Sequence, residues 1–253
     1  MRRILEKLSK GLISIEEAEL SLKSLTISEV EDMAKLDIKR EIRIGIPEII
    51  LAEGKSITQL EAITNKMITD TGKAIISRIE SENSNIIKNK FKDFLIEEYV
   101  SSKILIIKKS SKQPTKIKGK VGILSAGTAD IPIAEEARII LNEMGCEVIT
   151  EYDVGVAGLQ RLFPAINKMV NMKVDVIIAV AGREGALPTV IAGLVDIPII
   201  GVPTSMGYGF GEKGTSALMS MLQSCSLGIA TVNIDSGIAA GILAIIIIKR
   251  IHH

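Results

Sequence analysis

Short apolar runs alternate with amphipathic stretches throughout the second half of the chain. Each run holds aliphatic and β-branched residues and ends in small or polar residues, as a buried strand does. The predicted strands are residues 121–125, 147–152, 174–181, 197–202 and 230–234, and the predicted helices are residues 132–144, 159–171, 184–194, 213–224 and from about 238 onward. Regular alternation of this kind predicts an α/β fold, a three-layer doubly wound parallel sheet with helices on both faces.

The first half of the chain has a weaker and more polar pattern. It predicts helices over residues 2–10, from Ser14, from Ser56 or Thr58 to about Thr71 and over a polar stretch near 82–98, and strands over residues 74–79 and 104–107. Residues 108–120 are polar, contain Pro114 and are predicted to be a linker. Only four of the 21 glycines precede residue 119. We therefore expect a smaller, charged, mainly helical α+β domain at residues 1–118 and an α/β domain at residues 119–253.

Composition excludes several classes of protein. The net charge is +1, aromatic residues are 3% and tryptophan is absent, so nucleic acid is not an expected partner. The longest apolar run, residues 238–248, is much shorter than the roughly 20 residues of a membrane-spanning helix, so we expect a buried helix and no membrane partner. Two cysteines are too few for a disulfide framework and suit a reducing cytoplasm. His252 and His253, either native or the start of a purification tag, are the only histidines, which argues against a histidine-dependent triad or metal site inside the fold.

Four loops follow the predicted strands and carry the candidate chemistry. They are residues 125–130, 152–158, 181–188 and 203–209. Because the carboxyl ends of parallel strands meet at one edge of a sheet, these loops can share one cleft. Their glycines let backbone amides approach a phosphate group closely, and Pro132 suits the first turn of a helix whose N-terminus favours anions. An ordinary strand-to-helix connection remains the simpler interpretation of the first loop alone.

Three charged residues in these loops have structural as well as functional interpretations. Asp130 and Glu184 precede or open predicted helices, where a carboxylate can accept orphan backbone protons, so helix capping alone would account for them. Asp153 also suits a turn before Gly155, and Arg183 also suits an exposed surface.

The two cysteines differ in their predicted surroundings. Cys225 closes the predicted helix 213–224, where a buried small side chain and a thiolate nucleophile are the two interpretations. A nucleophilic Cys225 would need access to the cleft, and a cationic substrate could itself stabilise the thiolate. Cys146 follows Gly145 at the start of a predicted strand, away from the cleft end, and is expected to be structural.

These loops resemble a known family. The segments VGILSAGTADIP, YDVGVAG, AGREGALP, GVPTSMGYG and MLQSCSLGIATVNIDSG are similar to the LarB family of nickel-pincer cofactor biosynthesis proteins, whose C-terminal domain resembles the purine-pathway enzyme PurE, aminoimidazole ribonucleotide carboxylase. The segment LDIKREIRIGIPEIILAEGK resembles the N-terminal domain of the same family. The resemblance implies a PurE-like, flavodoxin-like catalytic domain. It covers nearly the whole chain with long motifs in the same order.

The resemblance also implies a reaction. The family converts nicotinic acid adenine dinucleotide and CO2 or bicarbonate to pyridinium-3,5-biscarboxylic acid mononucleotide and AMP, with a divalent cation expected to be Mg²⁺ and no organic cofactor. Matching to the family implies Cys225 as the nucleophile that adds to the pyridinium ring. Glu184 is the first candidate for the acid/base that handles the ring proton, and Asp130 is the second. Expected substrate-binding residues are Ser125, Gly127, Thr128, Asp153, Gly155, Gly182, Gly185, Ser205 and Tyr208.

Other interpretations remain open at the level of sequence. A homo-oligomer, octamer-like as in PurE relatives, is implied by the resemblance, and no metal ligands are identified. An aminoimidazole ribonucleotide carboxylase or mutase is one alternative, although the purine enzyme uses a catalytic histidine that this domain lacks. A nucleotide-binding module without catalysis is the other.

Overall fold

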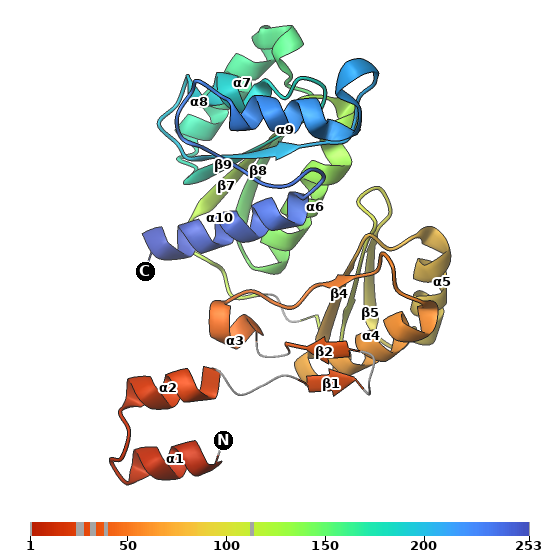
Figure 1. The fold of residues 1–253 in the computed structure, drawn as a ribbon, viewed down its shortest axis with the longest axis vertical. Helices are drawn as coiled ribbons and strands as arrows, with labels where there is room; N and C mark the ends of the chain where they lie inside the picture. Colours follow the sequence, from red (N-terminus) through yellow and green to blue (C-terminus); the bar gives the residue numbers. More distant parts are fainter. Residues whose placement is uncertain (1, 24–27, 31–33, 38–39, 112–113, 253) are drawn as a thin grey trace. The chain divides into compact units, whose positions relative to one another are not determined.

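The computed structural model of the protein describes residues 2–23, 28–30, 34–37, 40–111 and 114–252. Within these, the chain forms two compact units, Met1–Lys112 and Gln113–His253, each described here by itself (Figure 1). The division falls within the predicted linker, near the predicted domain boundary at residues 118–119. Residues 112–113 of that linker and His253 lie outside the described residues.

The C-terminal unit is built on a five-stranded, wholly parallel sheet. Its strands lie in the order β11-β10-β9-β7-β8, the flavodoxin-like order. After β8 is added on one side of β7, the following strands are added on its other side, so the strand order reverses between β7 and β9. The strands are β7 (Lys120–Ser125), β8 (Glu147–Glu151), β9 (Val176–Ala181), β10 (Ile199–Pro203) and β11 (Ile229–Thr231). Each lies within a few residues of its predicted position, and the predicted parallel α/β sheet is confirmed.

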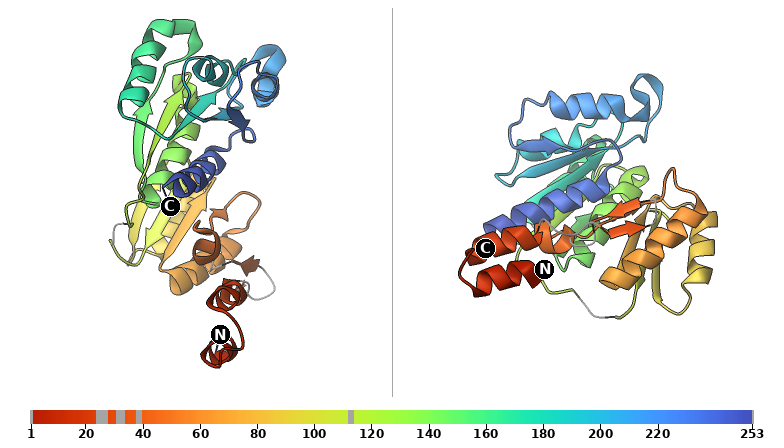
Figure 2. Two further views of the ribbon diagram at one scale, coloured as in Figure 1. Left: turned by 90° about the vertical axis from the view of Figure 1, so that its left-hand side faces the viewer. Right: turned by 60° about the horizontal axis from the view of Figure 1, so that its bottom comes forward.

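Helices cover both faces of this sheet. The helices are α6 (Ile131–Glu143), α7 (Leu159–Asn171), α8 (Leu187–Ala192), α9 (Thr215–Leu222) and α10 (Gly237–Ile251). Helices α6 and α10 pack together on one face, and α7, α8 and α9 lie on the other (Figure 1). The right-hand view of Figure 2 shows α9 and α10 on opposite sides of the sheet. The three predicted layers are therefore present.

Burial explains why the central strands are almost wholly apolar. All six residues of β9, with the sequence VIIAVA, are buried because both faces of the strand are covered by helices. The predicted buried helix near the C-terminus is α10, which buries one face through Ala240, Gly241, Ala244, Ile245 and Ile248. None of the helices described is both long and apolar enough to cross a membrane.

The N-terminal unit has a smaller mixed sheet of four strands in the order β3-β4-β6-β5. Its strands are β3 (Ile50–Leu51), β4 (Lys73–Ser77), β5 (Leu95–Tyr99) and β6 (Ile104–Lys108), and β1 (Ser28–Val30) pairs with β2 (Ala34–Leu36) in a separate hairpin. Its helices are α1 (Arg2–Ser9), α2 (Ile15–Lys23), α3 (Arg40–Ile44), α4 (Ile57–Thr71) and α5 (Ser81–Lys90). Helix α4 begins at a capping box formed by Ser56 and Gln59, which decides between the two predicted starts, Ser56 and Thr58.

One predicted element of this unit is wrong in its second half. The polar stretch near residues 82–98 is helical only to Lys90, and residues 95–99 form the edge strand β5. Its pattern of partial burial leaves no fully buried position, so the strand carries almost no hydrophobic signal. Pairing with the buried strand β6 decides its conformation. The C-terminal unit shows a smaller difference, because Gly209–Gly214 forms a 3₁₀ helix before α9 instead of belonging to it.

Candidate active site

The loops after four neighbouring strands meet in one cavity of about 600 Å³. The cavity lies beyond the carboxyl ends of β7, β8, β9 and β10, where the strand order reverses, which is the usual ligand position in this class of sheet. Its lining residues are Ala126, Gly127, Thr128, Ala129, Asp130, Asp153, Gly155, Val156, Ala157, Ala181, Gly182, Arg183, Glu184, Ala186, Leu187, Met206, Gly207 and Tyr208. The prediction that these loops share one cleft is confirmed.

Two glycines allow the loops to approach each other through their backbones. A Cβ atom on Gly182 would lie 2.3 Å from the carbonyl oxygen of Met206, and one on Gly155 would lie 2.6 Å from the carbonyl oxygen of Ala126. Both distances are far below van der Waals contact, so any side chain there would push two cavity loops apart. These glycines are therefore required for the shape of the site.

Asp130 ties three of the loops together. Its carboxylate accepts hydrogen bonds from the Thr204 hydroxyl at 2.6 Å and from the Gly127 amide at 2.9 Å, and a further one from the Gly182 amide. Its side chain makes no capping hydrogen bond to α6, but its bond to the Gly127 amide caps the short 3₁₀ helix Thr128–Asp130 that leads into α6, so helix capping accounts for only one of its hydrogen bonds. Burial raises the pKa of the Asp130 carboxyl above its ordinary value, and the three hydrogen bonds only partly oppose this.

This raised pKa predicts how the stability of the unit depends on pH. The pKa of Asp130 in the folded chain lies above its ordinary value of 3.8, so the folded chain holds this proton more tightly than the unfolded chain does. The stability that this proton binding contributes is therefore complete below pH 3.8 and is lost as the pH rises through the folded pKa. We expect the loss of unfolding free energy caused by Asp130→Asn to be largest at acidic pH and to shrink toward neutrality. Urea unfolding of wild type and variant across this range measures the difference.

A second variant tests the same assignment. Thr204→Val removes the hydroxyl that lowers the pKa of Asp130, so the pH window should move upward. A deficit of Asp130→Asn that is the same at every pH would contradict the assignment.

Asp153 and Arg183 occupy corresponding positions after β8 and β9. Both have left-handed backbones, with φ values of 57° in each case, which residues other than glycine rarely adopt. Such strain is concentrated at functional sites in many proteins. Asp153 also forms an ion pair with Arg161 at 2.5 Å, so its carboxylate is held at the cavity wall. Asp153 thus lies in a turn and lines the cavity, and its role in substrate binding stays a prediction.

Glu184 lines the cavity from the loop before α8 and is exposed, so a ligand can reach its carboxylate. Beside it, the Arg183 guanidinium lies over the Tyr208 ring, with its central carbon 4.2 Å from the ring centroid. Arg183 is therefore part of the cavity wall, where the sequence allowed either an exposed surface charge or a partner for a carboxylate or phosphate group.

Four of the predicted site residues do not line the cavity. The Ser125 hydroxyl is buried and accepts a hydrogen bond from the Asp153 amide at 3.3 Å, so it supports the neighbouring loop. Gly185 packs against Ala217, and Ser205 donates its amide to Asp235 at 2.8 Å. Cys225 is the fourth.

Cys225 is exposed and lies in the connection between α9 and β11. This connection reaches the amino ends of the strands, because Gly228 accepts a hydrogen bond from the Ile199 amide where β10 begins. The cavity lies at the opposite, carboxyl ends. Within one chain, the structure does not bring Cys225 into the cavity, and it is not the buried small side chain of the alternative interpretation.

Cys146 and His252 have structural surroundings. Cys146 is buried, and burial raises the pKa of its thiol to about 12, which makes it a poor nucleophile. His252 contacts Asp175 at 2.9 Å, and Asp175 also accepts the Lys120 amide at 2.7 Å. His252 therefore packs against the amino edge of the sheet, which corrects the expectation that no histidine lies in the fold.

The carboxylates of the cavity do not form a ready-made metal site. No group of three or more metal-ligating side chains occurs among the residues that the structure describes. Asp130 is occupied by its hydrogen bonds and Asp153 by Arg161. A protein cage for Mg²⁺ does not fit these residues. Magnesium often binds through substrate phosphates and only one or two carboxylates. The prediction of Mg²⁺ therefore applies only to an ion that arrives with the phosphates of the substrate.

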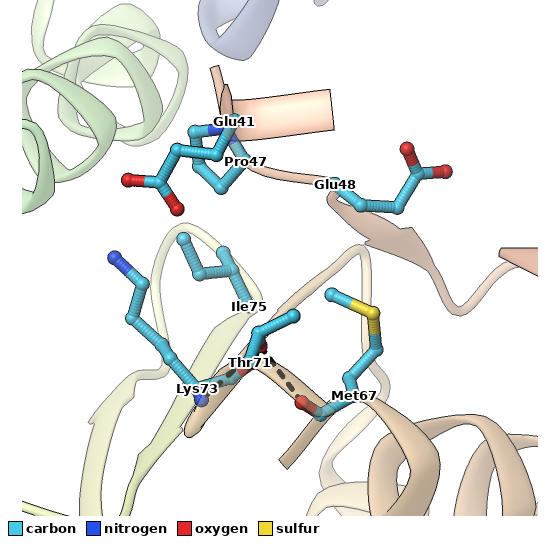
Figure 3. Close-up of a pocket in the computed structure, with 7 residues that line it drawn as sticks. All are labelled: Glu41, Pro47, Glu48, Met67, Thr71, Lys73 and Ile75. Carbon is cyan, nitrogen blue, oxygen red and sulfur yellow. Dashed lines mark hydrogen bonds between the residues drawn. The ribbon is translucent and has the colours of Figure 1, made fainter. Parts of the chain in front are cut away.

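The N-terminal unit contains a much smaller pocket. It is lined by Glu41, Pro47, Glu48, Met67, Thr71, Lys73 and Ile75 (Figure 3). Its volume is about 30 Å³, which is room for little more than a water molecule. Figure 3 shows Thr71 hydrogen bonded to the backbone of Met67 at its floor. Its size does not allow it to hold a nucleotide.

Comparison with known proteins places this site in a family. The AIR carboxylase family matches residues 120–253, which include every element around the cavity. The chain belongs to the AIR carboxylase family. The LarB/PurE-like N-terminal domain model matches residues 27–109, so the chain is a LarB-like member of this family. The resemblance seen in the sequence is confirmed.

Individual relatives match over the whole chain or over its second half. An uncharacterised protein of Methanocaldococcus jannaschii is 47% identical over 255 residues, covering 100% of this chain and 98% of its own. The N5-carboxyaminoimidazole ribonucleotide mutase of the same organism is 38% identical over 125 residues, which are 49% of this chain and 74% of the mutase. That of Pyrococcus horikoshii is 32% identical over 146 residues, which are 56% of this chain and 76% of the mutase.

The sequence contained signals for some residues that its interpretation missed. Thr204 directly follows β10 in a predicted cleft loop, which makes it a candidate partner for Asp130. Cys225 stands a few residues before β11, and a residue that precedes a parallel strand lies near the amino ends of the strands, so its position in the sequence already placed it away from the cleft. No sequence signal indicated that Arg183 would stack on Tyr208.

Proposed function

We propose that this AIR carboxylase family member adds a carboxyl group to C5 of the pyridinium ring of nicotinic acid adenine dinucleotide and then cleaves the phosphoanhydride, releasing AMP. One observation carries the proposal. The region that matches the AIR carboxylase family contains a cavity large enough for a nucleotide. Glycine-rich loops and the accessible Glu184 line it, and its lining residues include no histidine. The LarB/PurE-like N-terminal domain supports the same conclusion.

The chemistry requires a temporary change in the ring. A pyridinium ring is electron-poor, so C5 cannot attack CO2. Addition of a thiolate at C4 or C6 gives a neutral dihydropyridine whose C5 is an enamine carbon and forms the new bond to CO2. Glu184 then accepts the C5 proton, the carbon–sulfur bond breaks, and the thiolate leaves as the ring regains aromaticity. Water subsequently cleaves the phosphoanhydride.

Cys225 lies away from the cavity of its own chain, so it can supply the thiolate only to the cavity of another copy of the chain. We therefore assign it to the cavity of a neighbouring copy in a homo-oligomer. The side chains around it support an interface, because Met219 is 59%, Leu222 67% and Leu227 89% exposed in the single chain. Exposed apolar side chains in this number are suited to burial against another copy of the chain.

Incubation of the purified protein with nicotinic acid adenine dinucleotide, bicarbonate and Mg²⁺ tests the function. We expect mass spectrometry to show AMP and a mononucleotide that has gained one carboxyl group. The matched control replaces the dinucleotide with N5-carboxyaminoimidazole ribonucleotide, the substrate in the name of the related mutases. Conversion of the control alone would favour the purine activity, and binding without conversion of either would indicate a nucleotide-binding module.

A further inference from the structure

Arg183 is the single cationic side chain among the described residues that line the cavity. The others with charge are Asp130, Asp153 and Glu184, all acidic. A substrate with a carboxylate therefore finds one direct charge partner in the wall. The left-handed backbone of Arg183 fixes where its side chain starts, and its amide donates to the Met206 carbonyl at 3.2 Å.

The face of Tyr208 is occupied by a cation in the free chain. The Arg183 guanidinium lies 4.2 Å from the ring centroid, while the Tyr208 side chain is 79% exposed and lines the cavity. The face of an aromatic ring attracts ligand cations as well as Arg and Lys side chains. The ring therefore marks a place at the cavity where a flat cation can bind.

The neighbouring residues leave this place open. Gly207 and Gly209 flank Tyr208 with φ values of 156° and 77°, and a Cβ on Gly207 would come no closer than 3.7 Å to Arg183. The aromatic ring is thus presented between two glycines, with no side chain on either side of it in sequence.

We infer that a pyridinium ring of the substrate stacks on the face of the Tyr208 ring. Arg183, displaced from the Tyr208 face, then binds the carboxylate carried by the pyridinium ring. The inference rests on the proposed function and identifies the part of the site that selects a ring bearing both a positive charge and a carboxylate. On binding, the pyridinium ring takes the place of the Arg183 guanidinium on the face of Tyr208. Arg183 loses this weak contact and gains a charge-assisted hydrogen bond to the substrate carboxylate.

Calorimetric binding to the full chain tests the role of Tyr208 without requiring turnover. The probes are oxidised nicotinamide adenine dinucleotide, its reduced form with a neutral ring, and adenosine diphosphate ribose, which lacks the ring. We expect Tyr208→Leu to lower the ratio of oxidised to reduced affinity by about threefold to thirtyfold. Tyr208→Phe should preserve the ratio, and adenosine diphosphate ribose should bind both variants like wild type.

The role of Arg183 is tested with dinucleotides that differ only in the ring substituent. Arg183→Gln should lower the preference for the carboxylate over the carboxamide dinucleotide by about tenfold or more. An unchanged oxidised-to-reduced ratio in Tyr208→Leu, or an equal loss for adenosine diphosphate ribose, would overturn the inference. If the affinity ratios change as expected but the protein carboxylates no dinucleotide, the inference on Tyr208 and Arg183 stands and the proposed function is rejected. If no dinucleotide binds, both the inference and the proposed function are rejected.

Discussion

Replacement of Cys225 by serine is expected to abolish ring carboxylation, with a loss of at least about 10³-fold in rate. Serine is nearly the same size, but its hydroxyl is far less ionised than a thiol at neutral pH, so addition to the pyridinium ring should fail. Because Cys225 is exposed in the single chain, the folded state should tolerate the change. Carboxylated product is measured by mass spectrometry and dinucleotide affinity by calorimetry.

The matched control is Cys146→Ser. This thiol is buried beside the amino edge of the sheet, so a hydroxyl there should cost about 1–3 kcal/mol of stability while leaving the carboxylation rate near that of wild type. Wild type mixed with substrate should also show dihydropyridine-like near-ultraviolet absorbance that Cys225→Ser lacks. Near-normal turnover by Cys225→Ser would reject the covalent mechanism and leave Glu184 as the centre of the chemistry.

Mixing two inactive variants is expected to restore activity. Cys225→Ser retains Glu184 in its own cavity, and Glu184→Gln retains a thiol that it can supply to a neighbour. If the two groups act across an interface between copies, random mixing should give about one quarter of the sites both intact groups. Each variant alone should be inactive. Carboxylation after co-refolding or subunit exchange measures the effect, and native mass spectrometry confirms that mixed assemblies have formed.

The control for this experiment mixes Cys225→Ser with the double variant carrying Cys225→Ser and Glu184→Gln. That mixture contains no Cys225 thiol and should remain inactive. If mixed assemblies form but activity stays absent in the first mixture, Cys225 does not act in the cavity of another copy. The location of Cys225 at the amino ends of the strands would then exclude it from catalysis unless the chain rearranged substantially.

The sequence determined most of the C-terminal fold because its signals there are local and strong. The continuous apolar residues of β9 require burial on both faces, and helical spacing follows each such run. Parallel strands then bring successive loops to one edge, which is why Gly127, Asp153, Gly182 and Tyr208 could be assigned to one cleft before their distances were known. The edge strand β5 lacks such a signal, since pairing with β6 defines it.

The tertiary structure decided what each residue of the site does, because those roles depend on contacts between segments far apart in sequence. Local spacing offered helix capping as one interpretation of Asp130, but only the tertiary structure shows that Thr204 and Gly182 also bind its carboxylate from other loops. Arg183 acquires an aromatic partner only because the loops after β9 and β10 lie side by side. Spacing along the chain gives the edge at which a loop emerges, but hydrogen bonding and stacking depend on the three-dimensional path of the neighbouring loops.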